Sequence, residues 1–121
     1  MNSIGIGIHG TGLSADYHGY ALAKNKYFSL KAVSDDGYPQ ALSYAKRHHV
    51  DKCYGDLEYL LSCPDVDIVV VASPFFDNIK ILPYIIETGR SVIMETPLAG
   101  SVEDAERIVG MAEDIFLFPV S

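Results

Sequence analysis

Short apolar segments alternate with longer amphipathic segments along the whole chain. The apolar segments predict six strands, at about residues 3–9, 28–34, 53–54, 66–72, 91–94 and 115–120. The fourth of these is a continuous β-branched run, which is typical of a strand buried on both faces of a parallel sheet. The pattern therefore predicts a sheet built from many short strands, with helices between them.

Residues that favour helix ends support the helices between these strands. Pro39 stands in the first turn of the second helix, Asp77 can cap the fourth, Gly89 closes it, and Ser101 with Asp104 resembles a capping pair for the fifth. The first helix is predicted to run to about Lys24, and a brief third helix covers residues 56–61.

Two of the predicted helices carry apolar residues at helical spacing, which favours a buried face. These are Tyr38, Ala41, Leu42 and Ala45 in the second helix, and Val102, Ala105, Ile108, Val109 and Ala112 in the fifth. Strands that alternate with helices through short loops form right-handed βαβ units. We therefore expect one α/β domain over residues 1–121, a doubly wound parallel sheet (Rossmann fold) with strand order 3-2-1-4-5-6.

A glycine turn directly after the first strand carries the clearest chemical signal. Residues Gly10-Thr11-Gly12-Leu13-Ser14-Ala15 match G-x-G-x-x-(G/A) at the start of a helix. In this context Gly10 permits the tight turn, Gly12 lets a pyrophosphate approach the backbone, and Ala15 lets the helix lie close to the sheet. The free N–H groups and the helix dipole then favour an anion. The motif predicts dinucleotide binding at Gly10, Thr11, Gly12, Leu13 and Ser14, although an ordinary glycine turn is the alternative.

Asp35 strengthens the prediction of a dinucleotide site. It ends the second strand, 35 − 12 = 23 residues after Gly12, where such sites place an acid on the ribose 2′-hydroxyl. The alternative is a solvated turn acid. Because Asp36 is adjacent, two carboxylates would repel a 2′-phosphate, so we expect NAD rather than NADP.

Composition and charge exclude some classes of binding partner. Sixteen Asp and Glu against nine Lys and Arg give a formal charge of −7, which argues against nucleic acid or an anionic membrane as the main partner. The N-terminus lacks the basic stretch and the long apolar stretch of a signal peptide. The two cysteines, Cys53 and Cys63, are too few for a disulfide scaffold. We therefore expect a cytoplasmic protein. The cysteines and histidines lack zinc spacing, so we expect no metal site.

Five segments in order, residues 6–12, 32–35, 54–61, 64–74 and 92–99, make the chain resemble the glucose–fructose oxidoreductase/inositol dehydrogenase/MocA family. The resemblance implies the N-terminal NAD(P)-binding domain of an oxidoreductase that acts on sugars or polyols by hydride transfer. It also implies that Ser73-Pro74 run beside the cofactor and that Glu95 lies near the nicotinamide side. Phe75-Phe76 could flank the nicotinamide or cover a domain junction.

Three departures from the family pattern bear on catalysis. Thr96 stands where the family usually carries a lysine, Asn78 stands where it often has a histidine, and the family's C-terminal substrate domain is missing. Threonine is a poor acid or base near neutral pH. We therefore expect a cofactor-binding domain that is incomplete as an enzyme by itself, with a non-catalytic nucleotide-binding or interaction module as the alternative. The apolar residues 115–118 predict self-association through an edge strand.

Overall fold

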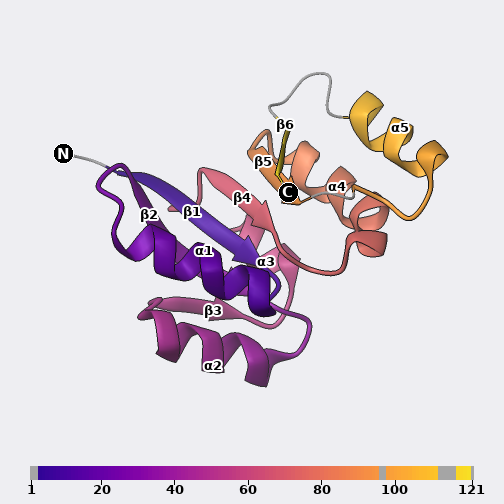
Figure 1. Cartoon of the computed structure of the whole chain (residues 1–121). Helices are drawn as coiled ribbons and strands as arrows, with labels where there is room; N and C mark the ends of the chain where they lie inside the picture. Colours follow the sequence, from indigo (N-terminus) through magenta and orange to yellow (C-terminus); the bar gives the residue numbers. More distant parts are fainter. Residues whose placement is uncertain (1–2, 96–97, 112–116, 121) are drawn as a thin grey trace.

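The computed structural model of the chain describes residues 3–95, 98–111 and 117–120, and strands alternate with helices throughout them (Figure 1). The strands are β1 (Ile4–His9), β2 (Phe28–Ser34), β3 (Lys52–Tyr54), β4 (Ile68–Val71), β5 (Ser91–Glu95) and β6 (Leu117–Val120). The helices are α1 (Leu13–Ala23), α2 (Tyr38–His48), α3 (Leu57–Leu61), α4 (Asn78–Glu87) and α5 (Val102–Met111), with a 3-10 turn, η1 (Phe75–Asp77), before α4.

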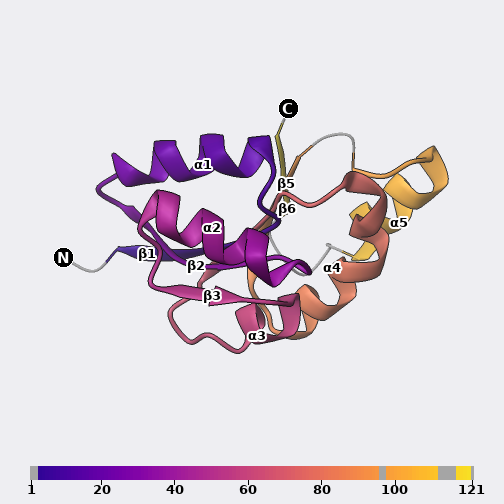
Figure 2. The same cartoon turned by 90° about the horizontal axis from the view of Figure 1, so that it is seen from below.

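The strands form one parallel sheet in the order β3-β2-β1-β4-β5-β6, which confirms the predicted doubly wound topology. Successive strands are added in opposite directions from the central pair, β1 and β4: β2 and β3 follow on the side of β1, and β5 and β6 on the side of β4. Helices α1 and α2 cover one face, and α3, α4 and α5 cover the other, as Figure 2 shows. None of the helices in the described part of the chain has the length and apolar character needed to cross a membrane.

Each face of the sheet has its own apolar core. Ile6 and Ile8 of β1 pack toward α1 and α2, in a cluster that includes Ala15 and Tyr44. Val69 and Val71 of β4 point to the opposite face, where the cluster includes residues of α3, α4 and α5. Because neighbouring β-branched residues of β4 enter different cores, the strand is buried on both faces, as its sequence predicts.

The predicted helix faces are partly wrong. In α2 the buried residues are Ala41, Tyr44 and Ala45, whereas Tyr38 and Leu42 are exposed. Tyr44 is buried because α2 packs on α1 at this point, where its hydroxyl donates a hydrogen bond to the Ala15 carbonyl oxygen at 2.6 Å. In α5 Ile108 is buried, but Val102 and Val109 are exposed, because this helix packs mainly against α4. Ala112 lies outside the described residues.

The residues predicted to end or cap helices do so in the structure, with one exception. Ser101 Oγ accepts a hydrogen bond from the Asp104 N–H at 3.1 Å, and Gly89 has the positive φ of 74° expected where a helix closes. Asp77 precedes α4, but its side chain makes no capping hydrogen bond, because the preceding 3-10 turn keeps it in a helical conformation instead of the extended one that capping requires.

Strand register brings the carboxyl ends of four strands to one edge of the sheet. His9 is level with Ser34 of β2 and with Val71 of β4, and Val71 is level with Met94 of β5. The loops that follow these strands therefore meet above the boundary between β1 and β4, where the strand order reverses. In a doubly wound sheet this is where ligands bind.

Candidate functional site

A cavity of about 600 Å³ opens at this edge of the sheet. It is lined by eight of the nine residues that the sequence predicts for a cofactor, namely Gly10, Thr11, Gly12, Ser14, Asp35, Ser73, Pro74 and Glu95. The ninth, Leu13, does not line the cavity and is 71% exposed. Residues from β1, β2, β4 and β5 or their following loops thus converge on one space.

The glycine turn has the geometry that an anion site requires. Gly10 has a φ of 105°, and a Cβ there would lie 2.5 Å from the Ser73 nitrogen. A Cβ on Gly12 would meet no atom within 4 Å, so this glycine faces open space. No side chain caps the start of α1. The first N–H groups of the helix are therefore free to donate to a ligand beside Gly12.

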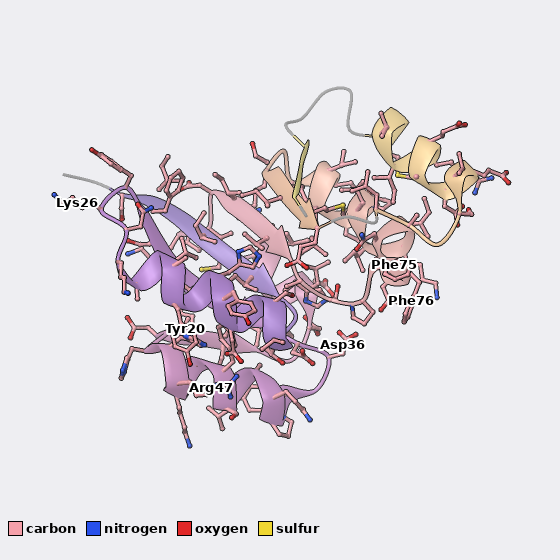
Figure 3. The ribbon with its side chains drawn as sticks, in the orientation of Figure 1. Tyr20, Lys26, Asp36, Arg47, Phe75 and Phe76 are labelled. Carbon is pink, nitrogen blue, oxygen red and sulfur yellow. The ribbon has the colours of Figure 1, made fainter. Side chains whose placement is uncertain are left out.

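Asp35 is held in a fixed position at one end of the cavity. Its Oδ2 accepts a hydrogen bond from the Thr11 hydroxyl at 2.8 Å, and its Oδ1 accepts one from the Gly37 N–H at 2.8 Å. Both donors stand on loops that the sheet positions, so the carboxylate has little freedom to rotate. Asp36 also lines the cavity and projects from the turn before α2 (Figure 3).

His9 is a cavity residue that the sequence analysis missed. It is 4% exposed, and its Nδ1 lies 2.8 Å from Ser34 Oγ. Burial lowers the pKa of His9 below its usual value, and the nearby carboxylates of Asp35 and Asp36 oppose this only in part. Its position directly before the first glycine of the turn was a signal that could have found it.

The other end of the cavity lies beyond β4. Asn78, at the start of α4, lines it together with Ser73 and Glu95. Glu95 Oε1 lies 3.1 Å from Nε2 of His18 on α1, so this contact joins the helix after the glycine turn to the end of β5. Thr96 lies outside the described residues.

The two phenylalanines before α4 differ in their relation to the cavity. Phe75 lines it, whereas Phe76 does not and is largely exposed. Both project from the same end of the sheet as Asp36 (Figure 3). Phe75 is therefore the one whose position suits contact with a ligand in this cavity.

Neither cysteine belongs to a metal cluster in the described residues. Cys53 is half-buried and Cys63 is buried, both as free thiols. Within the described ranges, no three His, Cys, Asp or Glu side chains are grouped to hold a metal ion.

Comparison with known proteins identifies the class of domain. A family model described as "Oxidoreductase family, NAD-binding Rossmann fold" matches residues 4–115. An uncharacterized protein of Saccharomyces cerevisiae is 32% identical over 118 residues, which cover 93% of this chain and 34% of that protein. A trans-1,2-dihydrobenzene-1,2-diol dehydrogenase of Xenopus tropicalis is 23% identical over 72% of this chain and 26% of its own length. The chain thus spans about a third or less of these relatives.

Solved structures share the fold over nearly the whole chain. A probable dehydrogenase from Thermotoga maritima superposes with a TM-score of 0.89 at 25% identity, covering 96% of this chain and 35% of that one. GenD2 from gentamicin A biosynthesis, in complex with NAD, gives a TM-score of 0.89 at 24% identity, covering 99% and 35%. KijD10, a 3-ketoreductase from Actinomadura kijaniata in complex with TDP-benzene and NADP, gives 0.88 at 23%, covering 98% and 38%.

GenD2 is in complex with NAD and KijD10 with NADP, so structural similarity to these proteins does not distinguish NAD from NADP as the cofactor. The family itself follows from the model match, which covers most of the chain. This chain belongs to the glucose–fructose oxidoreductase/inositol dehydrogenase/MocA family of oxidoreductases and contains its NAD-binding Rossmann domain.

Proposed function

We propose that this chain binds NAD in the cavity at the carboxyl edge of its sheet and forms the cofactor-binding part of an oxidoreductase acting on a sugar or polyol. The observation that carries the proposal is the open space beside Gly12, next to the uncapped start of α1. A pyrophosphate fits there because the helix dipole and the free N–H groups attract an anion. This local attraction offsets the net negative charge of the chain.

Three groups of residues would hold the cofactor. Gly10, Gly12 and the following N–H groups would bind the pyrophosphate, and Asp35 would accept hydrogen bonds from the adenosine ribose. Ser73 and Glu95 stand on the side toward β4 and β5, where the nicotinamide would lie. When bound, NAD supplies the hydride acceptor. The chain's own residues orient it, which is a large share of such catalysis.

The proposal includes a preference for NAD over NADP. Asp35 is fixed by two hydrogen bonds, and Asp36 lines the same cavity. A 2′-phosphate would therefore meet two carboxylates, one of which cannot easily turn away. Coulomb repulsion and the loss of the ribose hydrogen bonds both disfavour NADP.

Calorimetry on the purified chain tests the proposal. We expect NAD to bind more tightly than NADP, and the Asp35→Ala variant to show a smaller difference, since Asp36 remains. Gly12→Ala should weaken NAD binding by about tenfold or more, because the added methyl group would occupy the space in which we place the pyrophosphate. The same variant should unfold at the denaturant concentration of the wild type, because the added Cβ meets nothing in the protein.

Gly110→Ala is the matched control, since a Cβ on Gly110 also meets no atom within 4 Å and this residue lies on α5 outside the cavity. It should bind NAD as the wild type does. Equal NAD affinity of Gly12→Ala and wild type would contradict the proposed site. Tighter binding of NADP than NAD would contradict the preference.

A second candidate function is a nucleotide-binding module that has lost the chemistry. Thr96 and Asn78, which replace a lysine and a histidine usual in the family, favour it. Mixing this chain with the separately expressed C-terminal part of a family member, NAD and a series of polyols separates the two candidates. Reduction of NAD, followed by its absorbance, supports the enzyme, and binding without reduction supports the module.

A further inference from the structure

A second cavity lies between α3 and α4, on the face of the sheet that these helices share (Figure 2). We call it the α3–α4 groove. Its volume is about 660 Å³, which suits a small molecule. It shares Asp36 and Ile81 with the cavity described above. Because α3 and α4 follow parallel strands and start at their carboxyl ends, the groove leads from that cavity toward the opposite edge of the sheet.

The middle of the α3–α4 groove is apolar. Leu57 and Leu61 lie about one helical turn apart on α3 and are only 8% and 9% exposed. Ile81 and Tyr84 line the groove from α4, also about one turn apart, and Tyr84 is largely exposed. The groove thus contains an apolar strip between two helices, with an aromatic side chain beside which a cation is favourable.

The charged side chains on the α3–α4 groove are all carboxylates. Asp36 and Asp56 lie where it starts, and Glu58 and Glu87 line it from α3 and α4. None of the four forms an ion pair with a residue in the described part of the chain. Glu87 also stands in the last turn of α4, which has no basic residue and where the helix dipole disfavours a carboxylate. A cation in the groove would offset the repulsion among these groups and the unfavourable position of Glu87.

The far end of the groove, where α3 and α4 end, offers hydrogen-bond acceptors. The Ser62 hydroxyl donates to the Glu58 carbonyl oxygen at 3.0 Å, and the Thr88 hydroxyl donates to the Ile85 carbonyl oxygen at 2.6 Å. Since each hydroxyl has a single proton, both oxygens can only accept from a ligand. Together with the Glu87 carboxylate, they match the three N–H donors of a primary ammonium group.

The near end of the groove offers a second set of acceptors. Oδ1 of Asp56 accepts a hydrogen bond from the Tyr59 N–H at 3.0 Å, which holds this carboxylate at the start of α3. Asp36 lines the same end, because it follows β2. Ile81, which lines both cavities, marks this end on α4 and is six positions before Glu87, about 9 Å along the helix axis. Two places for a cation are therefore separated by an apolar strip.

We propose that the α3–α4 groove binds a linear aliphatic polyamine, with one ammonium group at Glu87 and another at Asp36 and Asp56. The methylene chain packs on the apolar strip between them. A metal ion has no apolar surface and a fatty acid has no positive charge, so neither matches both parts of the groove. An alkyl monoamine matches only one end. This proposal does not depend on dinucleotide binding.

Straight-chain diamines of increasing length provide the test. Calorimetry on the purified chain, without nucleotide, compares 1,4-diaminobutane, 1,8-diaminooctane, octylamine and spermidine. We expect 1,8-diaminooctane to bind about tenfold or more tightly than 1,4-diaminobutane, because added methylenes contact the apolar strip and the longer chain reaches both ends. Octylamine, with the same chain but one ammonium group, should bind about 3- to 10-fold more weakly than 1,8-diaminooctane. Spermidine, which is equally long, should bind like 1,8-diaminooctane.

Two variants that keep the side-chain shape assign the effect to the two ends. Glu87→Gln and Asp56→Asn should each reduce the preference for 1,8-diaminooctane over octylamine to within about twofold. Asparagine also caps helices well, so Asp56→Asn leaves the start of α3 intact. Glu106→Gln is the matched control, since it makes the same change of charge at an exposed position on α5 outside both cavities. It should keep the wild-type preference.

Three results would each overturn the proposal. The first is that neither spermidine nor the diamines bind, and the second is that affinity does not depend on chain length. The third is that Glu106→Gln weakens binding as much as Glu87→Gln does, which would show attraction to the net charge of −7 alone. Because nucleotide is left out, failure of NAD to bind would overturn the proposed function without affecting this test.

Discussion

The buried imidazole of His9 lies beside the cavity and has no ion-pair partner within salt-bridge distance among the described residues. Because burial lowers its pKa, the neutral form predominates in the folded protein at neutral pH. The carboxylates nearest to it, Asp35, Asp36, Asp56 and Asp77, weaken this effect but do not reverse it. His9 is therefore a neutral hydrogen-bonding group in an otherwise acidic site.

Stability should decrease in mild acid because of His9. Its pKa lies below 6.5 in the folded chain and near 6.5 in the unfolded one, so below pH 6.5 the unfolded chain binds the proton more readily. Between pH ~7.5 and ~5 the His9→Asn variant should lose less free energy of unfolding than wild type. Urea unfolding at each pH measures this. Parallel pH profiles for the two proteins would contradict it.

A second titratable group, the carboxyl of Asp16, affects stability in a different pH range. The hydrogen bond to His48 and the Arg47 guanidinium hold the pKa of Asp16 below its usual 3.8. The stability that this group contributes is present above that value and is lost as the pH falls below it. The two effects therefore do not overlap in the window used for His9.

Thr11 positions Asp35, the acid of the proposed ribose site. Its hydroxyl donates to Asp35 Oδ2, so Thr11→Val, which keeps the shape but removes the donor, should leave that carboxylate freer to rotate. We expect NAD affinity to fall by about 2- to 10-fold, with little change in the affinity for a phosphate-only ligand such as pyrophosphate. Calorimetry with both ligands measures the two effects. An equal loss for both would show that Thr11 acts on the phosphate site instead.

At the scale of elements, the contact between α1 and α2 depends on a small residue in α1. A Cβ on Gly19 would lie 2.5 Å from the His48 ring. That ring cannot move away easily, because its Nε2 is 2.6 Å from Asp16 Oδ1 and the rings of Tyr20 and Tyr44 pack around it. Figure 3 shows Tyr20 and Arg47 in this region between the two helices.

Gly19→Ala should therefore destabilise the chain, although alanine favours helix more than glycine does. We expect a loss of about 1–3 kcal/mol in the free energy of unfolding, as for other overpacked sites. Gly110→Ala in α5 is the matched control and should raise it by up to about 1 kcal/mol, because nothing opposes the gain in helix propensity. Urea denaturation measures both variants, and a stabilising Gly19→Ala would show that His48 can relocate.

Elements were predicted well where local chemistry determines them, and less well where packing does. The β-branched run of β4 and the glycine turn carry their own structural requirements, so the burial of β4 and the position of the cavity followed from them, whereas the strand order followed from the alternation of strands and helices. The buried face of α2 did not, because Tyr44 and His48 are buried by contacts with α1, whose position the sequence of α2 does not contain. Asn78 departs from the family pattern, but its burial and its hydrogen bond to the Leu98 carbonyl involve a residue twenty positions away, which the local sequence does not indicate.

At the scale of the whole molecule, β6 lies at one end of the sheet and pairs only with β5 among the described strands. An unpaired edge of this kind can accept a strand from another chain. Self-association through it stays a prediction, and the net charge of −7 opposes it through repulsion between copies.

Light scattering over a wide range of protein concentrations, at low and at moderate salt, measures this self-association. We expect the average mass to rise above that of a single chain with concentration, and to rise more at moderate salt, where repulsion is screened. A mass that stays that of one chain under all these conditions would contradict the prediction.

The cavity straddles the line along which β1 meets β4. On one side lie the strands that carry Asp35 and the glycine turn, and on the other those that carry Ser73 and Glu95. A dinucleotide lying across this line would bind both halves of the sheet at once, and would stabilise the folded state by mass action. Resistance of the chain to proteases should then follow the supply of nicotinamide nucleotide in the cell, so that the abundance of the protein depends on metabolic state as well as on its synthesis.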